Sequence, residues 1–282
     1  MDKKKILVTG SNGQLGSEIK ALSQTYPQFD FTFTSSKELD ITNKLNVTNF
    51  FKENTFDYCI NCAAYTQVDK AEKEREKAFV VNVTGVKNLT QNCKKTNTVL
   101  IHISTDFVFD GIKNEPYTEE DVPKPINYYG ETKYLGELEI QKELKSYFII
   151  RTSWLYGRFG NNFVKTILRL AKEKGELSIV NNQFGIPTNA GDLTKFMLFL
   201  IDNSIDKYGI YHFSNSSNEK VSWYDFAKEI LKINNISVSL LETTKYRTLA
   251  IRPLFSKMNL SKIKKLNYNT RNWRIALANY MK

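Results

Sequence analysis

Three glycines near the N-terminus place the strongest constraint on the fold. Residues 4–9 predict a buried strand, and a helix is expected to run from the turn that follows to about Tyr26. Gly10, Gly13 and Gly16 occupy that turn. Glycines there let the backbone approach a pyrophosphate closely, and the helix N-terminus offers it free N–H groups. In this context the motif predicts a dinucleotide site, against the alternative of a tight turn without a ligand.

The rest of the first half alternates between strands and helices. Further strands are expected at 29–34, 57–61, 99–104 and 147–151, and helices at 71–95, with a kink near Gly85, and at 127–145. Strands and helices that alternate at this spacing are typical of a parallel sheet covered on both faces. The predicted fold class is therefore α/β, a Rossmann-type doubly wound parallel sheet.

The pattern changes after about Trp154. Helices are expected at 162–174, 192–202 and 222–232, with a loop at 181–190. We interpret residues 1–153 as a dinucleotide-binding domain and residues 154–282 as mainly a smaller α/β substrate-binding lobe. No Gly/Ser/Pro-rich linker separates the two, so we expect them to be interleaved.

Composition excludes several classes of protein. The chain has 282 residues, of which 41% are hydrophobic and 25% charged, as in a globular protein. It contains no run of about 18 apolar residues that would span a membrane. The apolar stretch after Lys5 is too short for a signal-peptide core. Three cysteines are too few for a disulfide framework, which leads us to expect a reduced, cytoplasmic protein.

The net charge of +10 comes from the C-terminus. No Asp or Glu follows Glu242, whereas residues 243–282 contain ten Lys or Arg. Such a segment can face nucleic acid, a membrane surface or an anionic small molecule, or can simply be solvated. It contains no aromatic platform motif and no helix-turn-helix signature. We therefore expect neither a nucleic acid nor a membrane as a partner.

The end of the second expected strand bears on the choice of cofactor. An acidic residue there would hold the ribose 2′-hydroxyl of NADH. The strand instead ends at Thr34, and Ser35, Ser36 and Lys37 follow. Hydroxyl groups and a lysine could accept a 2′-phosphate. The sequence therefore favours NADPH, with NADH as the alternative.

A tyrosine and a lysine lie four residues apart in the helix expected at 127–145. Tyr129 and Lys133 would share one face of that helix. A phenol has a pKa near 10, and a neighbouring ammonium is expected to bring it closer to neutrality. Tyr224 and Lys228 have the same spacing but lie far from the glycine turn. Thr105 follows the fourth strand, where a substrate carbonyl could bind.

The histidines and cysteines predict no metal site. His102 and His212 lie inside expected strands, and we interpret both as structural. Neither pairs with the cysteines at a zinc-binding spacing. Cys59 and Cys62 form a CxxC sequence without thioredoxin-like surroundings, so a redox pair is the less favoured reading.

Eight sequence blocks carry a resemblance to a known family. They are TGSNGQLG (9–16), NCAAYTQVDKAE (61–72), STDFVFDG (104–111), YYGETKYLGE (128–137), RTSWLYG (151–157), NNFVKTILRLAK (161–172), NNQFGIPT (181–188) and RPLFS (252–256). Over essentially the whole chain, they resemble the dTDP-4-dehydrorhamnose reductases, which are extended short-chain reductases. The resemblance implies that NADPH reduces the C4 ketone of dTDP-4-dehydro-L-rhamnose to give dTDP-L-rhamnose.

The resemblance also implies roles for individual residues. Tyr129 would protonate the C4 oxygen, Lys133 would tune Tyr129 and hold the ribose, Thr105 would bond the ketone, and Asp106 would accompany them. Cofactor contacts are implied for Gly10, Asn12, Gly13, Gln14, Leu15, Asp40, Ile41, Ala63, Ala64, Tyr65, Thr66 and Asn82. Substrate contacts are implied for Thr105, Asp106, Trp154, Asn162, Phe163, Gln183 and Arg252, with Arg252 the best candidate for the diphosphate.

Two departures and two alternatives remain. Phe107 stands where the family usually has Tyr, and the chain lacks the C-terminal carboxylates that bridge metal-linked dimers in some members. We therefore expect no metal, and a monomer or homodimer.

A non-catalytic NADP-binding regulatory subunit of the methionine adenosyltransferase type is one alternative function, but it would not need Thr105, Tyr129 and Lys133. Another sugar-nucleotide reductase, an epimerase or a dehydratase would share the cofactor motif, but a dehydratase should have an acidic pair where only Asp106 is present.

Overall fold

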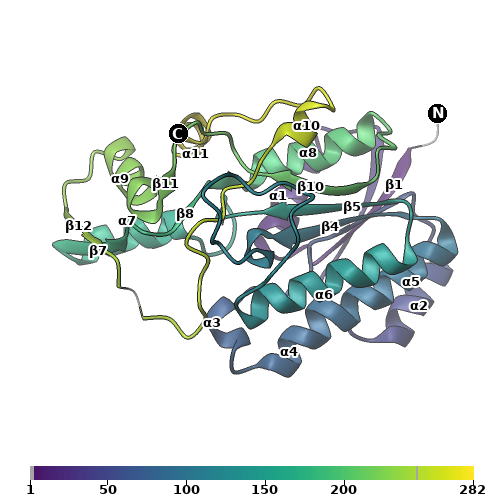
Figure 1. The fold of residues 1–282 in the computed structure, drawn as a ribbon. Helices are drawn as coiled ribbons and strands as arrows, with labels where there is room; N and C mark the ends of the chain where they lie inside the picture. The colour runs from purple at the N-terminus through teal and green to yellow at the C-terminus, as the bar shows by residue number, and fades with distance from the viewer. Residues whose placement is uncertain (1–2, 246) are drawn as a thin grey trace.

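The computed structural model describes residues 3–245 and 247–282. Residues 1 and 2, which precede the apolar stretch considered as a signal peptide, lie outside the described residues. Its centre is a six-stranded parallel sheet in the order β10-β5-β4-β3-β1-β2 (Figure 1). The strands are β1 (Lys4–Thr9), β2 (Phe29–Thr34), β3 (Tyr58–Asn61), β4 (Val99–Thr105), β5 (Tyr147–Thr152) and β10 (Gly209–Phe213). The order reverses at β1, as in a doubly wound fold, which confirms the predicted fold class.

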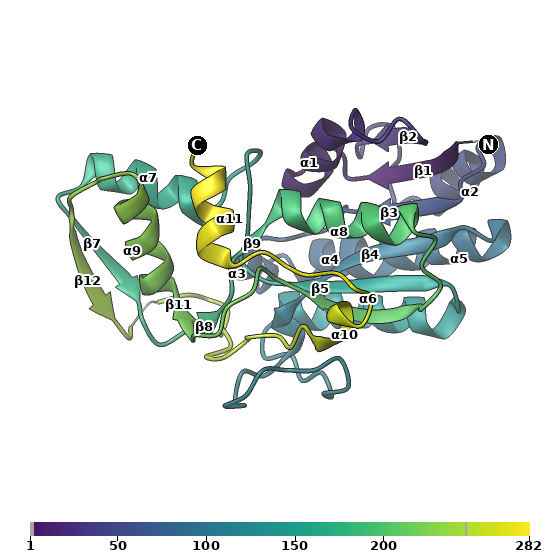
Figure 2. The ribbon, with the colours of Figure 1, turned by 90° about the horizontal axis from the view of Figure 1, so that it is seen from above.

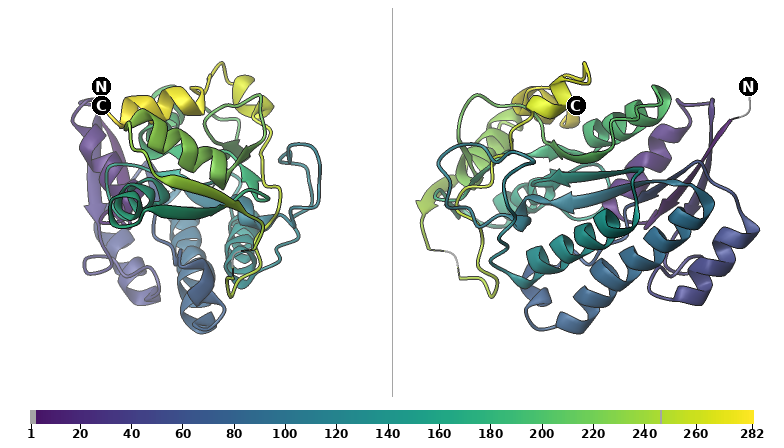
Figure 3. Two further views of the ribbon diagram at one scale, coloured as in Figure 1. Left: turned by 90° about the vertical axis from the view of Figure 1, so that its left-hand side faces the viewer. Right: turned by 45° about the vertical axis from the view of Figure 1, so that its right-hand side comes forward.

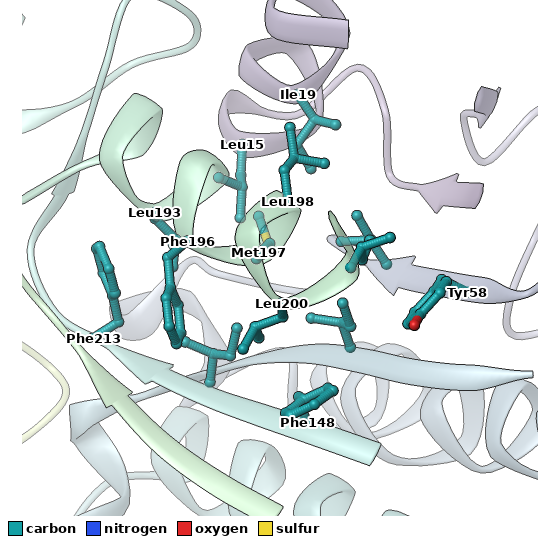
Figure 4. Packing of buried hydrophobic residues seen from close by; sticks show 14 of the residues in the cluster. Leu15, Ile19, Tyr58, Phe148, Leu193, Phe196, Met197, Leu198, Leu200 and Phe213 are labelled. Carbon is teal, nitrogen blue, oxygen red and sulfur yellow. The ribbon is translucent and has the colours of Figure 1, made fainter. Parts of the chain in front are cut away.

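Helices cover both faces of this sheet (Figures 1 and 3). One face carries α2 (Lys44–Glu53), α5 (Val86–Thr96) and α6 (Tyr128–Glu143), and the other carries α1 (Gln14–Ser23) and α8 (Ala190–Asp202). Leu15 and Ile19 of α1 pack with Leu193 and Met197 of α8 above the sheet (Figure 4). The strands are thus buried on both sides, and polar groups gather where they end.

The helix expected at 71–95 is broken. The chain instead forms α3 (Val68–Ala71), α4 (Arg75–Phe79), a π-helical turn η1 (Val80–Gly85) and then α5. Between α3 and α4, Glu72 accepts a hydrogen bond from the N–H of Tyr128 at the start of α6, 2.8 Å away. The wider π turn carries the buried Asn82, whose amide bonds groups outside its helix. The breaks therefore bring polar groups to one end of the sheet.

A smaller lobe lies beyond the carboxyl ends of the strands (Figure 2). It contains α7 (Phe163–Glu173), β7 (Glu176–Val180), α9 (Trp223–Ile233), β12 (Ser239–Thr243) and α11 (Trp273–Tyr280). The stretch expected as a loop at 181–190 holds two short strands, β8 (Phe184–Gly185) and β9 (Thr188–Asn189). The remaining short elements are η2 (Asp106–Val108), β6 (Leu155–Tyr156), β11 (Val221–Ser222) and α10 (Ser261–Lys264).

The two parts of the chain are interleaved. α8 and β10 lie beyond residue 153 in the sequence but pack on, or pair within, the main sheet. The division of the chain at residue 153 therefore stays an interpretation, because α8 and β10 follow that residue in the sequence but belong with the main sheet. Within the described residues, no helix has the length and apolar character needed to cross a membrane.

Candidate active site

The turn between β1 and α1 is built too tightly for side chains. Gly10 has a φ of +63°, and a Cβ there would lie 2.6 Å from the backbone nitrogen of Ala63. A Cβ on Gly16 would lie 2.6 Å from the carbonyl oxygen of Gly10. Gly13 is the N-cap of α1 and supplies no side-chain cap to the first N–H groups of the helix. The turn therefore presents backbone donors and a helix N-terminus to whatever lies in front of it.

A cleft of about 410 Å³ opens in front of that turn, at the carboxyl ends of the strands. It brings together ten of the predicted site residues: Gly13, Gln14, Leu15, Ala64, Thr66, Thr105, Asp106, Tyr129, Lys133 and Trp154. Its other lining residues are Cys62, Val68, Ile103, Ser104, Phe107, Thr152, Ser153, Leu155 and Asn161. Cys62 and Ser153 follow directly on β3 and β5, and Ile103, Ser104 and Thr152 lie at the carboxyl ends of β4 and β5. Position at a strand end is the signal that could have identified these five.

Tyr129 lies in the first turn of α6. Asn127 caps this helix by accepting a hydrogen bond from the N–H of Gly130 at 2.8 Å. Gly130 lets the helix meet η2, because a Cβ there would lie 2.1 Å from the carbonyl oxygen of Phe107. Burial raises the pKa of Tyr129 to about 12, against the lowering effect of a hydrogen bond to Thr105. The phenol is therefore protonated at neutral pH and can act as an acid.

Thr105 and Asp106 lie where β4 ends. The Thr105 hydroxyl donates to the Asp106 carboxylate at 3.1 Å and accepts the N–H of Phe107 at 3.2 Å. Burial raises the pKa of Asp106 to about 6. Oδ2 of Asp106 has no hydrogen-bond partner among the described residues. The cleft thus holds a carboxylate whose charge changes just below neutrality.

Lys133 shares a helix with Tyr129 but forms its hydrogen bonds with residues of β4. Its Nζ donates to the carbonyl oxygen of Ile103 at 2.6 Å and lies 3.2 Å from Nε2 of His102. Burial lowers the pKa of Lys133 to about 8. The prediction that Lys133 brings the pKa of Tyr129 towards neutrality is therefore wrong for this arrangement, because burial of the phenol dominates and the ammonium is directed elsewhere.

His102 is buried and hydrogen-bonded, but it is adjacent to the site. Thr9, Asn61 and His102 are paired across the three neighbouring strands β1, β3 and β4. Asn61 bonds His102, and His102 contacts Lys133. Sequence reasoning placed His102 in a strand but missed this contact, because the register of the strands was unknown.

Several predicted cofactor residues lie outside the lining of the cleft: Gly10, Asn12, Asp40, Ile41, Ala63, Tyr65 and Asn82. Asn82 holds the chain beside the cleft, since its Oδ1 accepts the N–H of Tyr65 at 2.9 Å and its Nδ2 donates to the Tyr65 carbonyl at 3.1 Å. Asp40 accepts the N–H and hydroxyl of Thr42. Direct cofactor contacts from these residues remain predictions.

The segment after β2 differs from the interpretation used to choose the cofactor. The carboxylate of Glu38 accepts the N–H of Ser35 at 2.7 Å and also its hydroxyl. These hydrogen bonds lower the pKa of Glu38. The sequence suggested that this segment has no carboxylate near the cofactor. The carboxylate of Glu38, three residues after Ser35, nevertheless folds back onto it. Lys37 is exposed beside it and remains the cation available to a phosphate.

A small cavity of about 20 Å³ adjoins the cleft and shares Phe107 and Trp154 with it. Trp154 has a φ of +47° and stacks on Trp223 with ring centroids 3.7 Å apart. Gln183 and Arg252 also line this cavity, and their contacts with the substrate stay predictions. The guanidinium of Arg252 pairs with Asp69 at 2.8 Å, while its buried Nε has no partner among the described residues.

Asn162 and Phe163 line neither space. Asn162 caps α7 and donates to Oε1 of Gln14 at 3.0 Å. Phe163 packs against Trp223 inside the smaller lobe. Both residues make structural contacts, and Asn162 supports Gln14 at the edge of the cleft. Their substrate contacts stay predictions.

Comparison with known proteins decides the family. The family model described as RmlD substrate binding domain matches residues 4–282. A dTDP-4-dehydrorhamnose reductase of Aggregatibacter actinomycetemcomitans is 39% identical, over 98% of this chain and 97% of the relative. The chain belongs to the dTDP-4-dehydrorhamnose reductase family. The crystal structure of the Bacillus anthracis dTDP-4-dehydrorhamnose reductase in complex with NADP is 40% identical with a TM-score of 0.94, covering 99% of both chains.

The structure shows the surroundings of two features noted in the sequence. Phe107 lies edge-on to Tyr129 with ring centroids 5.8 Å apart. The basic C-terminal segment is partly neutralised by ion pairs, since Arg271 bonds Asp192 and Arg274 bonds Glu219 at 2.9 Å. Two of the arginines in the C-terminal segment therefore form ion pairs that hold this segment against the rest of the protein.

Proposed function

We propose that this protein reduces the C4 ketone of dTDP-4-dehydro-L-rhamnose to dTDP-L-rhamnose with NADPH. One observation carries the proposal: Thr105, Tyr129 and Lys133 line the same cleft as the glycine turn at the N-terminus of α1. The family to which the chain belongs, and the NADP complex of the Bacillus anthracis relative, support the choice of reaction and cofactor.

The glycine turn fits the pyrophosphate of a dinucleotide. Its backbone leaves no room for a Cβ at Gly10 or Gly16, and the first N–H groups of α1 lack a side-chain cap. Gly13, Gln14 and Leu15 would hold the phosphates. When bound, NADPH supplies the hydride that reduces the ketone carbon. Lys37 would face the 2′-phosphate that distinguishes NADPH from NADH.

Tyr129 delivers the proton in this proposal. As the C4 oxygen gains negative charge it becomes more basic than a phenolate, so transfer of the Tyr129 proton to it is favourable. A phenol with a pKa of about 12 is fully protonated beforehand. Thr105, which bonds Tyr129 and Asp106, would orient the ketone oxygen towards the phenol. Lys133 would bond the ribose and compensate the phenolate that remains.

The residues around the small cavity beside the cleft would contact part of the sugar nucleotide, because a space of about 20 Å³ is too small to hold the nucleotide itself. Trp154, Gln183 and Arg252 line this cavity, and Nε of Arg252 has no partner within the described part of the chain. A guanidinium suits a diphosphate because it presents parallel donors to the phosphate oxygens. To bind in this way, Arg252 would exchange or share its contact with Asp69.

The proposed location of the protein is the cytoplasm, because all three cysteines are free thiols.

The test is to mix the protein with NADPH and dTDP-4-dehydro-L-rhamnose and to follow the absorbance of the reduced nicotinamide. We expect oxidation of NADPH with formation of dTDP-L-rhamnose, and little oxidation by the Tyr129→Phe variant. Parallel reactions with NADH and with a UDP-linked 4-ketosugar would measure the preferences for the cofactor and the base. Binding of NADPH without any oxidation would contradict the proposal and favour a regulatory subunit.

A further inference from the structure

A buried polar row leads from the sheet to Lys133. Asn61 is 1%, His102 0% and Lys133 2% exposed. The Asn61 Oδ1 accepts the Thr9 hydroxyl at 2.7 Å, and the Asn61 Nδ2 lies 3.0 Å from Nδ1 of His102. Nε2 of His102 lies 3.2 Å from Nζ of Lys133. One imidazole therefore connects the end of β3 to a residue of the cleft.

The orientation of Asn61 fixes the tautomer of His102. Oδ1 of Asn61 also accepts the backbone N–H of Ala63 at 3.1 Å. Because a backbone N–H can only donate, the amide cannot be turned round, and its NH₂ group must face the imidazole. Nδ1 of His102 must then accept, which leaves the single proton of a neutral ring on Nε2. Burial lowers the pKa of His102, so the ring stays neutral.

This tautomer has a consequence for the lysine. The Nε2–H of His102 points at Nζ of Lys133, so Nζ must accept a hydrogen bond in that direction. An ammonium has no lone pair, whereas an amine can accept from His102 and still donate to the carbonyl oxygen of Ile103. The tautomer of His102 therefore favours the uncharged amine of Lys133 over the ammonium.

The other groups around Lys133 are compatible with an amine. Cys62 lies beside it on the segment after β3, and burial raises the pKa of that thiol, which is therefore neutral. Glu137, one turn further along α6, favours the ammonium. Its carboxylate is already bonded by Arg151 at 2.7 Å and by Ser104. Tyr129 and Asp106 face the same cleft from α6 and η2.

We propose that His102 is a positioning residue that favours the uncharged amine of Lys133 over the ammonium in the free protein, through a tautomer dictated by Asn61. The catalytic consequence rests on the proposed function. If the reaction needs the ammonium, the fraction of free protein with a charged Lys133 sets the fall of kcat/KM for NADPH at high pH. His102 then governs the pH range of the enzyme without touching the substrate.

The tautomer can be measured without any activity. The chain has only two histidines. Long-range ¹H–¹⁵N spectra of protein labelled in its histidine rings should show two ring systems, and the His212→Gln variant assigns them. We expect His102 to carry its proton on Nε2 throughout the neutral range. A proton on Nδ1, or an imidazolium at pH 6, would overturn the proposal whether or not the protein is a reductase.

A second experiment inverts the tautomer. In Asn61→Asp, a carboxylate replaces the NH₂ donor, so Nδ1 of His102 should carry the proton and Nε2 should accept from an ammonium. We expect the fall of kcat/KM at high pH to move to at least about tenfold lower proton concentration. His212→Gln, at a buried histidine outside the cleft, should leave the profile unchanged. A merely structural role of His102 would instead lower kcat/KM equally at every pH.

The new carboxylate also adds a charge, so its direct effect has to be separated. Asn61→Asp should shift the profile much less in a His102→Leu background, because the ring that transmits the change is gone. An equal shift in both backgrounds would show that charge alone acts, and would overturn the proposal. If the reductase assay shows no activity, the pH dependence of NADPH binding provides the same comparison. The proteins compared are then the native protein, Asn61→Asp, His102→Leu and the double variant.

Discussion

Replacing Lys133 by methionine should stabilise the folded protein while removing function. The fall in the pKa of Lys133 from 10.5 to about 8 means that burying the charged lysine costs about 3 kcal/mol. Methionine avoids that cost but leaves the carbonyl oxygen of Ile103 without its donor, which costs about 1 kcal/mol. We therefore expect Lys133→Met to increase the free energy of unfolding by about 2 kcal/mol at pH 7, and to weaken both NADPH binding and turnover.

The pH dependence of this gain is the sharper test. Between pH 8 and 10.5 the unfolded lysine binds more protons than the folded one, so the stability of the native protein should rise with pH in that window. The advantage of the methionine variant should be full below pH 8 and should disappear towards pH 10.5. Urea unfolding of both proteins at several pH values measures the difference. A destabilised variant at pH 7, or a difference independent of pH, would refute the reasoning.

Four further predictions concern other residues. Tyr129→Phe should lower turnover by about 10²–10⁴-fold with NADPH affinity unchanged, as judged by single-turnover kinetics and fluorescence titration; a loss below tenfold would argue against the role of the phenol. Gly10→Ala should weaken NADPH binding, because a φ of +63° and a close contact both oppose a Cβ; calorimetry showing normal affinity would contradict this. Glu137→Gln should cost about 3–5 kcal/mol in denaturant unfolding, because it leaves Arg151 buried without its counter-charge; a loss under about 1 kcal/mol would mean that the pair matters little. Asp106→Asn should remove any fall in kcat on the acid side near pH 6, where the carboxylate of the native protein is protonated; an identical acid limb in both proteins would assign that limb elsewhere.

The strands and the glycine turn could be predicted because their signals are local. Phe29–Thr34 is bounded as expected, and Gly10 and Gly13 lie between a buried strand and a helix as the motif requires. Asn127, Asn162 and Ser222 cap the helices that were expected to begin there. These features depend on hydrophobic period and capping chemistry over a few residues.

What the sequence left out depends on contacts between distant segments. The Thr9–Asn61–His102 row follows from strand register, and the environment of Lys133 follows from that row. The break of the 71–95 helix depends on what Glu72 and Asn82 bond elsewhere. For the same reason the pKa of Tyr129 could not be inferred from its spacing to Lys133 alone, because burial decides it.

The most direct test of the proposed reaction follows the transferred hydrogen. The protein is incubated with dTDP-4-dehydro-L-rhamnose and with NADPH carrying deuterium on the transferred position of the nicotinamide. The product is then examined by NMR and mass spectrometry. The account predicts dTDP-L-rhamnose with one deuterium at C4 of the hexose and an equal amount of NADP⁺. Recovery of unreduced ketone beside protein-bound, unoxidised cofactor would contradict it.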